Sequence, residues 1–182
     1  KLDIDVWELI SLANRHPRIN ILQPGPGVGG HCIAVDPWFI VSKTPNEAKV
    51  IHTAGKVNDS KPQWVIDKVK ISIADFLQAN PNKTAKDVTI ACYGLAFKPD
   101  IDDLRESPAF HITQKISKMH KGRVLSVEPN IDSSPESLKT VKLSSVANAY
   151  KEAEIHVLLV DHKEFKENKQ NQGLIIDTKS IW

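Results

Sequence analysis

The chain has few of the residues that mark a specialised environment. Among 182 residues there are only two cysteines, which are too few for a disulfide framework and lack the spacing of a zinc site. A reducing compartment follows, so we expect a cytoplasmic protein. No apolar run approaches the roughly 18 residues of a membrane span, and the first residues lack the pattern of a signal peptide.

An excess of charge of one sign is also missing. The net charge is only +2, from 24 basic and 22 acidic residues, which argues against a nucleic-acid partner and against a membrane-surface protein. There is no initiator methionine, and helical apolar spacing runs from Leu2 to Ala13 without a cap before it. We therefore expect a piece of a longer protein.

The first part of the chain is predicted to be helical. Helical periodicity covers three ranges, namely 3–14, 46–55 and 62–78. A Pro/Gly-rich loop is expected over 19–37. A break between the last two helices is predicted at 58–60, with Ser60 as a cap and Pro62 near the next first turn.

The second part has a different pattern, which begins after the polar stretch 79–83. Short apolar strands are predicted at 88–93, 124–127, 155–160 and 174–176, with helices at 107–118 and 144–152. This alternation predicts an α/β fold, with a parallel sheet covered on both faces that binds ligands at the carboxyl ends of its strands. We place the domains at 1–80 and 81–182.

Half of the eight glycines lie in one window, Gly-Pro-Gly-Val-Gly-Gly at 25–30. The window matches GxGxxG literally, but that fingerprint needs a strand before it and a helix after it. Pro24 and Pro26 remove two N–H donors, and Pro24 blocks a central strand. We therefore reject a dinucleotide site here.

The window leads instead to a thiol. Glycines let a ligand approach the main chain closely, so we expect the N–H groups of 29–32 to face a substrate beside the Cys32 sulfur. Asp36 follows four residues later, and a thiolate with a carboxylate that manages protons or water is suited to covalent catalysis. The alternative is that Cys32 is a small apolar residue in a tight turn. Cys92 lies in an apolar run and is predicted to be core, and the histidines show no metal-ligand spacing.

Three segments together carry a resemblance to a known family. They are NRHPR at 14–18, GPGVGGHCIAVDPWF at 25–39 and GLAFKPDIDDLRESP at 94–108. The chain resembles the UDP-glucose/GDP-mannose dehydrogenase family along its whole length. The resemblance implies the end of a central helical domain followed by a C-terminal Rossmann-like domain, with the NAD-binding domain preceding Lys1.

The family's chemistry agrees with the interpretation of the thiol. Members oxidise C6 of a nucleotide sugar from alcohol to carboxylate with two NAD. By similarity, Cys32 forms a thiohemiacetal and then a thioester, which water hydrolyses with the help of Asp36.

The resemblance also implies binding residues. The residues similar to substrate contacts are Arg18, Leu22, Gly29, Phe97 and Lys98. Arg18 resembles a residue that reaches a neighbouring subunit's site, and Arg105 resembles the arginine that reaches the cofactor. The alternative for Arg105 is an ordinary charge in the acidic cluster around it.

Two positions depart from the family pattern. Val35 stands where many members have Lys, which favours an N-acetylhexosamine over UDP-glucose. Lys179 stands where relatives often have Arg, and because Lys lacks the planar fork of Arg, we carry no phosphate role onto it.

The substrate implied is therefore UDP-N-acetylmannosamine, with UDP-N-acetylglucosamine and GDP-mannose as alternatives. The resemblance also implies a homodimer through the central helices. By itself, the chain would be a UDP-sugar-binding and dimerisation module without turnover.

Overall fold

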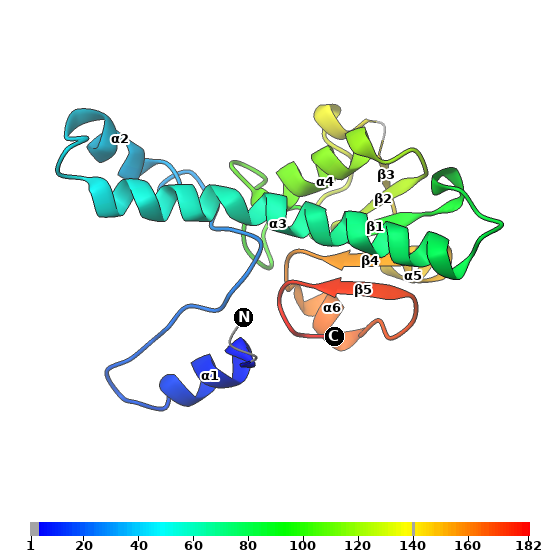
Figure 1. Ribbon diagram of the computed structural model, residues 1–182, viewed down its shortest axis with the longest axis horizontal. Helices are drawn as coiled ribbons and strands as arrows, with labels where there is room; N and C mark the ends of the chain where they lie inside the picture. Colours follow the sequence, from blue (N-terminus) through cyan, green and yellow to red (C-terminus); the bar gives the residue numbers. More distant parts are fainter. Residues whose placement is uncertain (1–3, 140) are drawn as a thin grey trace.

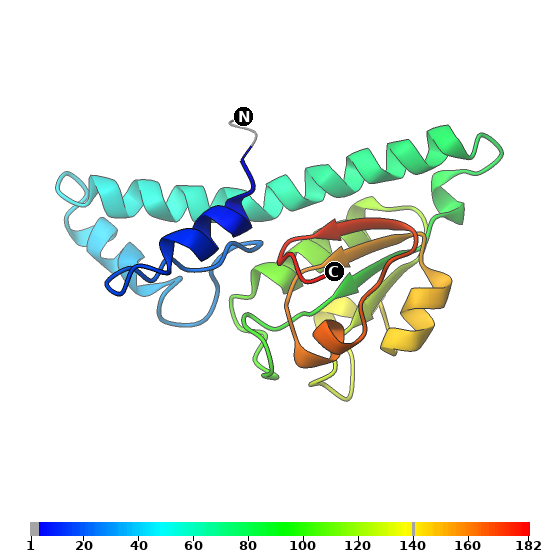
Figure 2. The ribbon, with the colours of Figure 1, turned by 90° about the horizontal axis from the view of Figure 1, so that it is seen from below.

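The structure is a computed structural model that describes residues 4–139 and 141–182. It consists of an elongated helical arm and a sheet flanked by helices (Figure 1). The arm contains α1 (Val6–Ala13), α2 (Asp36–Lys43) and the first half of α3 (Lys49–Ala79). Helix α3 continues from the arm along one side of the sheet (Figure 2).

The sheet has five strands, all of them parallel. They are β1 (Ile90–Tyr93), β2 (Val124–Val127), β3 (Lys142–Leu143), β4 (Ile155–Leu158) and β5 (Leu174–Asp177). The order is β3-β2-β1-β4-β5, so the chain crosses the sheet between β3 and β4 and the strand order reverses at the β1/β4 pair. The predicted α/β fold with a parallel sheet is confirmed, and this reversal is where such sheets bind ligands.

The helices cover both faces of the sheet because its strands are apolar on both sides. In β1, Ile90 and Cys92 pack in the cluster that includes α3 and α4 (Pro108–Met119). Alternate residues, including Tyr93, pack in the cluster with α5 (Val146–Glu152) and α6 (Lys163–Glu167). Cys92 is buried as predicted, and burial raises the pKa of its thiol to about 12.

The predicted break at 58–60 is wrong, because α3 is one continuous helix with Pro62 inside it. The Ser60 hydroxyl donates to the Val57 carbonyl, with an oxygen–oxygen distance of 2.7 Å, so it does not cap a new helix. Proline removes one N–H donor and usually bends or breaks a helix. The helix persists because its next turns pack against the sheet.

Three residues make that packing, and all are buried in the core next to β4 and β5: Val65, Ile66 and Val69. The second half of α3 therefore contributes to the core of the sheet, while the domain boundary after residue 80 stays a prediction. Helix α2 begins inside the range predicted as loop, and β3 and α6 were not predicted. Across residues 4–139 and 141–182, no helix combines the length and apolar character needed to cross a membrane.

A buried histidine of β4 forms hydrogen bonds on the face of the sheet that α5 and α6 cover. His156 is 1% exposed, and its Nδ1 lies 2.8 Å from the Tyr93 hydroxyl. Its Nε2 lies 3.0 Å from the Gln170 amide nitrogen. Burial lowers the pKa of His156 to about 4, since an imidazolium is poorly solvated there.

We expect this histidine to make the fold sensitive to acid. The unfolded chain takes up the proton near the ordinary pKa of about 6.5, whereas folded His156 does so only near 4. The free energy of unfolding should therefore fall as the pH drops from about 6.5 to 4. In His156→Gln this fall should be smaller by about 2–3 kcal/mol, measured by urea unfolding at a series of pH values. Parallel pH profiles for the two proteins would contradict the assignment.

Candidate functional site

The glycine-rich loop rests on the sheet domain. A Cβ on Gly29 would meet the Glu106 carbonyl and would lie 2.6 Å from Pro108 Cδ, and Gly30 has a φ of +91° with the Phe97 ring beside it. No L side chain fits the first position, and few residues adopt the backbone of the second. What approaches this bare backbone is the segment 97–108, while the predicted contact of the 29–32 N–H groups with substrate stays a prediction.

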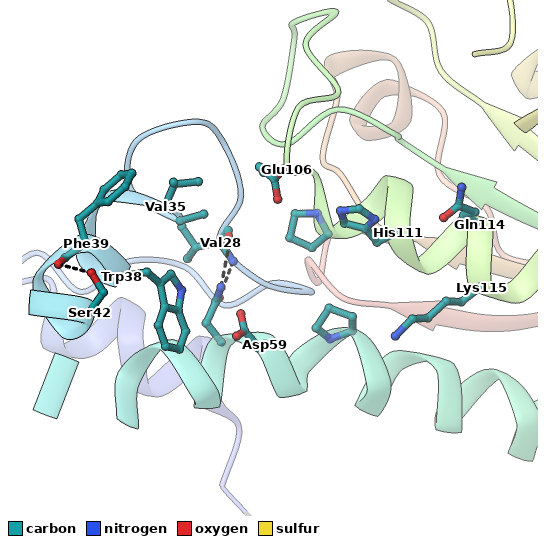
Figure 3. A pocket seen from close by; sticks show the side chains of 14 residues that line it. Val28, Val35, Trp38, Phe39, Ser42, Asp59, Glu106, His111, Gln114 and Lys115 are labelled. Atoms are coloured by element: carbon teal, nitrogen blue, oxygen red, sulfur yellow. Dashed lines mark hydrogen bonds between the residues drawn. The ribbon is translucent and has the colours of Figure 1, made fainter. Parts of the chain in front are cut away.

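A side chain from α3 fixes the same loop from its other side. The Asn58 Oδ1 accepts the Val28 N–H at 2.7 Å, and its Nδ2 donates to the Val28 carbonyl at 3.0 Å; the two bonds are dashed in Figure 3. Asn58 lies in the range predicted as a helix break, so its role was missed. Its partner is 30 residues away, and no local pattern announces such a bond.

Cys32 and Asp36 are joined by a backbone hydrogen bond. Cys32 is an exposed free thiol. The Asp36 N–H donates to the Cys32 carbonyl at 2.8 Å, and Asp36 is the first residue of α2. The two residues therefore lie one helical turn apart, while the pairing of the thiol with the carboxylate stays a prediction.

Arg105 lies within electrostatic reach of this thiol. It forms an ion pair with Asp103, with a nitrogen–oxygen distance of 2.6 Å. The hydrogen bonds from Arg105 lower the pKa of Asp103 to about 2. The pKa of Arg105 is raised, first by Asp103 and to a lesser degree by the charge of Cys32. This ion pair is consistent with the alternative interpretation of Arg105 as a charge in the acidic cluster, while the cofactor contact stays a prediction; the guanidinium remains mostly exposed.

A small pocket of about 120 Å³, which we call the strand-end pocket, lies where the strand order reverses. Residues that follow β1, β4 and β5 line it, and so do two residues of the glycine-rich loop: Ala96, Phe97, Lys98, Leu159, Val160, Lys179, Pro26 and Gly27 are among them. Phe97 and Lys98 are thus brought to the predicted ligand edge of the sheet. Lys179 joins them, although its ammonium also pairs with Asp161 at 3.3 Å.

A larger groove of about 720 Å³ lies between the arm and α4 (Figure 3). Trp38 and Asp59 line it from the arm, and His111 and Lys115 line it from α4. Val35 and Pro62 line it as well, whereas the candidate catalytic, substrate and cofactor residues named from the sequence do not. Its charged groups are of mixed sign, so it does not have the character of an anion site.

Two predicted substrate contacts lie apart from the pocket. Arg18 and Leu22 are exposed, Leu22 at 79%. They belong to the segment between α1 and the glycine-rich loop, which loops out beyond the end of α1, away from the sheet, before it returns toward α3 (Figure 1). Within the described part of the chain, neither lines the strand-end pocket, and their contact with substrate stays a prediction.

The described residues do not form a dinucleotide cradle. In a Rossmann domain the N–H groups of the loop after the first strand hold a phosphate. Here the Leu95 and Ala96 N–H groups instead donate to the carboxylate of Glu128. Gly94 has a φ of +89°, and a Cβ there would lie 2.7 Å from a methyl of Val160. The described residues also contain no group of three or more His, Cys, Asp or Glu side chains placed to hold a metal ion.

Comparison with known proteins gives the relationship. The profile described as "UDP-glucose/GDP-mannose dehydrogenase family, UDP binding domain" matches residues 91–182, and that of the family's central domain matches residues 1–60. The chain is 60% identical to a UDP-N-acetyl-D-mannosamine dehydrogenase of Yersinia pestis, over 98% of the chain and 43% of the relative. It is 50% identical to an NDP-N-acetyl-D-galactosaminuronic acid dehydrogenase of Ralstonia nicotianae, over 100% of the chain and 42% of the relative.

Comparison with solved structures gives the same relationship. The UDP-N-acetyl-mannosamine dehydrogenase of S. aureus is 38% identical with a TM-score of 0.75, over 99% of this chain and 41% of that one. A UDP-D-ManNAc dehydrogenase of Pyrococcus horikoshii is 30% identical with a TM-score of 0.79, over 98% and 41%. The chain thus spans less than half the length of the relatives it matches. Because the UDP-binding profile alone covers half of its residues, the chain belongs to the UDP-glucose/GDP-mannose dehydrogenase family, which confirms the resemblance of its motifs.

Proposed function

We propose that this chain supplies two parts of an NAD-dependent 6-dehydrogenase that converts UDP-N-acetylmannosamine to UDP-N-acetylmannosaminuronate. They are the glycine-rich loop with its Cys32 thiol, called the thiol loop below, and the nucleotide-binding domain. The observation that carries the proposal is the contact between the glycine-rich loop and the 97–108 segment. Through it, the loop that ends in an exposed thiol also lines the strand-end pocket. The names of relatives at 55–60% identity support the choice of sugar.

The nucleotide would bind at the strand-end pocket. Two lysines, Lys98 and Lys179, line it, and ammonium groups suit the charge of a diphosphate. Lys179 shares its charge with Asp161, whereas Lys98 is exposed and lies 5.7 Å from the centre of the Phe97 ring. Lys98 is therefore the stronger candidate for the phosphate contact.

The thiol would make the second oxidation possible. Oxidation of the C6 alcohol gives an aldehyde, whose carbon is trigonal and forms a tetrahedral hydride donor only after a nucleophile adds. The Cys32 thiolate adds to that carbon, and the resulting thiohemiacetal loses hydride to become a thioester. Water then attacks the thioester while Asp36 takes up the proton, which releases the acid and the free thiol.

NAD supplies the hydride acceptor for both oxidations. Since the described residues form no dinucleotide cradle, we propose that NAD is bound by the part of the longer relatives that this chain does not match. Arg105 is the residue of this chain proposed to contact it. Its guanidinium is mostly exposed beside the thiol loop, and it would also attract the thiolate.

We further propose a homodimer through the central helices. Helix α3 exposes apolar side chains at seven-residue intervals, with exposures of 82%, 55%, 55% and 54%: Val50, Val57, Trp64 and Ile71. Such a row is typical of a helix that packs against another helix. The segment with Arg18 also runs away from its own sheet (Figure 1), which supports a contact of Arg18 with the partner's site.

We expect UDP to bind to this chain in isothermal titration calorimetry. Lys98→Ala should bind UDP about tenfold more weakly, because a hydrogen bond to a charged phosphate is lost. Lys118→Ala, which removes an exposed lysine of α4, is the matched control and should leave the affinity unchanged. NAD alone should give no heat of binding. Equal affinities in the Lys98 and Lys118 variants would exclude the proposed phosphate contact.

The whole reaction is tested in a chimera, in which this chain replaces the matching segment of the Yersinia pestis relative. We expect NADH formation with UDP-N-acetylmannosamine, in preference to UDP-N-acetylglucosamine and GDP-mannose. Cys32→Ser should lower acid formation by about 10²-fold or more, because the covalent intermediate is lost. Asp36→Asn should leave a thioester on Cys32 that mass spectrometry detects.

The other thiol provides the control for this chimera. Cys92→Ala removes a buried cysteine of the core, and its activity should follow that of the unaltered chimera. Full acid formation by Cys32→Ser would overturn the covalent role. A preference for GDP-mannose would overturn the choice of sugar.

Substitution in the exposed row of α3 should separate the subunits. Trp64→Glu places a charge in the row, and we expect sedimentation velocity to show monomer where the unaltered chain is a dimer. Lys56→Glu changes an exposed side chain outside the row and should leave the dimer intact. A dimer that survives Trp64→Glu would place the interface elsewhere.

A further inference from the structure

A buried carboxylate holds the start of the loop after β1. Glu128 directly follows β2 and is only 3% exposed. Its Oε2 accepts the N–H of Leu95 at 2.7 Å and the N–H of Ala96 at 3.1 Å. These two residues immediately precede Phe97 and Lys98. The direction in which the chain enters the strand-end pocket is therefore fixed by Glu128.

A buried histidine connects this carboxylate to the end of the same loop. His162 is fully buried, and its Nε2 lies 3.0 Å from Glu128 Oε2. Its Nδ1 accepts the Asp100 N–H at 2.9 Å, and the Asn130 Nδ2 lies 3.1 Å from the same nitrogen. Because Nδ1 is an acceptor, the proton is on Nε2 and is donated to Glu128.

Asp100 needs this support because its backbone is strained. Its φ is +60°, a left-handed conformation that costs a non-glycine residue about 1 kcal/mol or more. Its carboxylate accepts the Lys163 N–H at 3.0 Å, in addition to the bond of its own N–H with His162. Both ends of the loop 95–100 are thus tied to the same buried pair.

Every partner of Glu128 is a hydrogen-bond donor. Its second oxygen, Oε1, accepts the backbone N–H and the side-chain amide of Asn130, each at 3.1 Å. Burial alone would raise the pKa of Glu128, but the bonds from His162 and from the backbone N–H groups hold it below its ordinary value. In a Rossmann domain that binds a dinucleotide, the N–H groups at this position hold a phosphate of the ligand. Here the Glu128 carboxylate, an anion of the protein itself, occupies them.

We propose that Glu128 and His162 are positioning residues for the nucleotide. They fix the loop 95–100 so that Phe97 and Lys98 line the pocket, and they close this sheet to a dinucleotide bound in the Rossmann manner. This inference rests on the proposed function, because it takes Phe97 and Lys98 to contact the nucleotide.

The sharpest variant is Glu128→Gln, which keeps the shape and replaces one oxygen by an NH₂ group. That group must face donors, since all the partners of Glu128 are donors. We expect the UDP affinity of the chain to fall about tenfold, as for the loss of a hydrogen bond to a charged group. The backbone amides of Leu95 and Ala96 should exchange with solvent faster, which hydrogen–deuterium exchange measures.

Two further variants separate positioning from general stability. His156→Gln alters another buried histidine, which hydrogen-bonds to Tyr93 and Gln170 and not to the loop. It should lower stability and leave the UDP affinity of the folded protein unchanged. His162→Gln can keep the bond to Glu128 but removes the Nδ1 acceptor of the Asp100 N–H. It should also weaken UDP binding, so the test stays decisive where Glu128→Gln does not fold.

The outcomes distinguish this inference from the proposed function. Normal UDP binding and normal amide exchange in Glu128→Gln, or in His162→Gln where the former does not fold, would overturn the positioning role alone. An equal loss of UDP affinity in His156→Gln would overturn it as well, because the effect would then be one of stability. Absence of UDP binding by the unaltered chain would overturn the nucleotide site itself, and the positioning role with it.

Discussion

The close approach of Gly29 to the turn that precedes α4 is the contact on which the site depends. The Glu106 carbonyl and the Pro108 ring occupy the space where a Cβ would stand, so only glycine allows the arm to meet the sheet domain at this distance. Asn58 fixes the loop from α3 through two hydrogen bonds with Val28. These contacts fix the glycine-rich loop that leads to the exposed thiol of Cys32.

The second constraint lies inside the sheet domain and is electrostatic. A carboxylate in a buried place is costly unless donors surround it, and Glu128 is surrounded by main-chain N–H groups and by His162. Because these N–H groups are engaged internally, a ligand at this edge must be held by side chains and by the outer surface of the loop. The lysines of the strand-end pocket meet that requirement, and thus a Rossmann-like sheet is suited to a nucleotide sugar without a glycine-rich phosphate loop.

Much of the sheet domain could be predicted from sequence, because its strands are short apolar runs and Ser107 caps α4 with a bond to the Phe110 N–H. Local signals failed where distant packing decided the outcome. Ser60 and Pro62 predict a break, yet the burial of the following turns on the sheet keeps α3 continuous. Strand β3 has only two residues, which is too short for any periodicity to show.

The candidate site divides in the same way. The turn that joins Cys32 to Asp36 is local, and Phe97 and Lys98, which line the strand-end pocket, belong to a recognisable motif. Asn58, Glu128 and His162 were missed because their bonds to Val28, Leu95 and Glu128, respectively, span at least 30 residues of sequence. These long-range contacts also join the two parts of the site. Phe97 lines the strand-end pocket while its ring packs against Gly30 of the thiol loop, so a movement of loop 95–100 cannot change one without shifting the other. The strand-end pocket and the glycine-rich loop are therefore connected through one side chain, and the proposed covalent step on a bound sugar needs such a fixed connection.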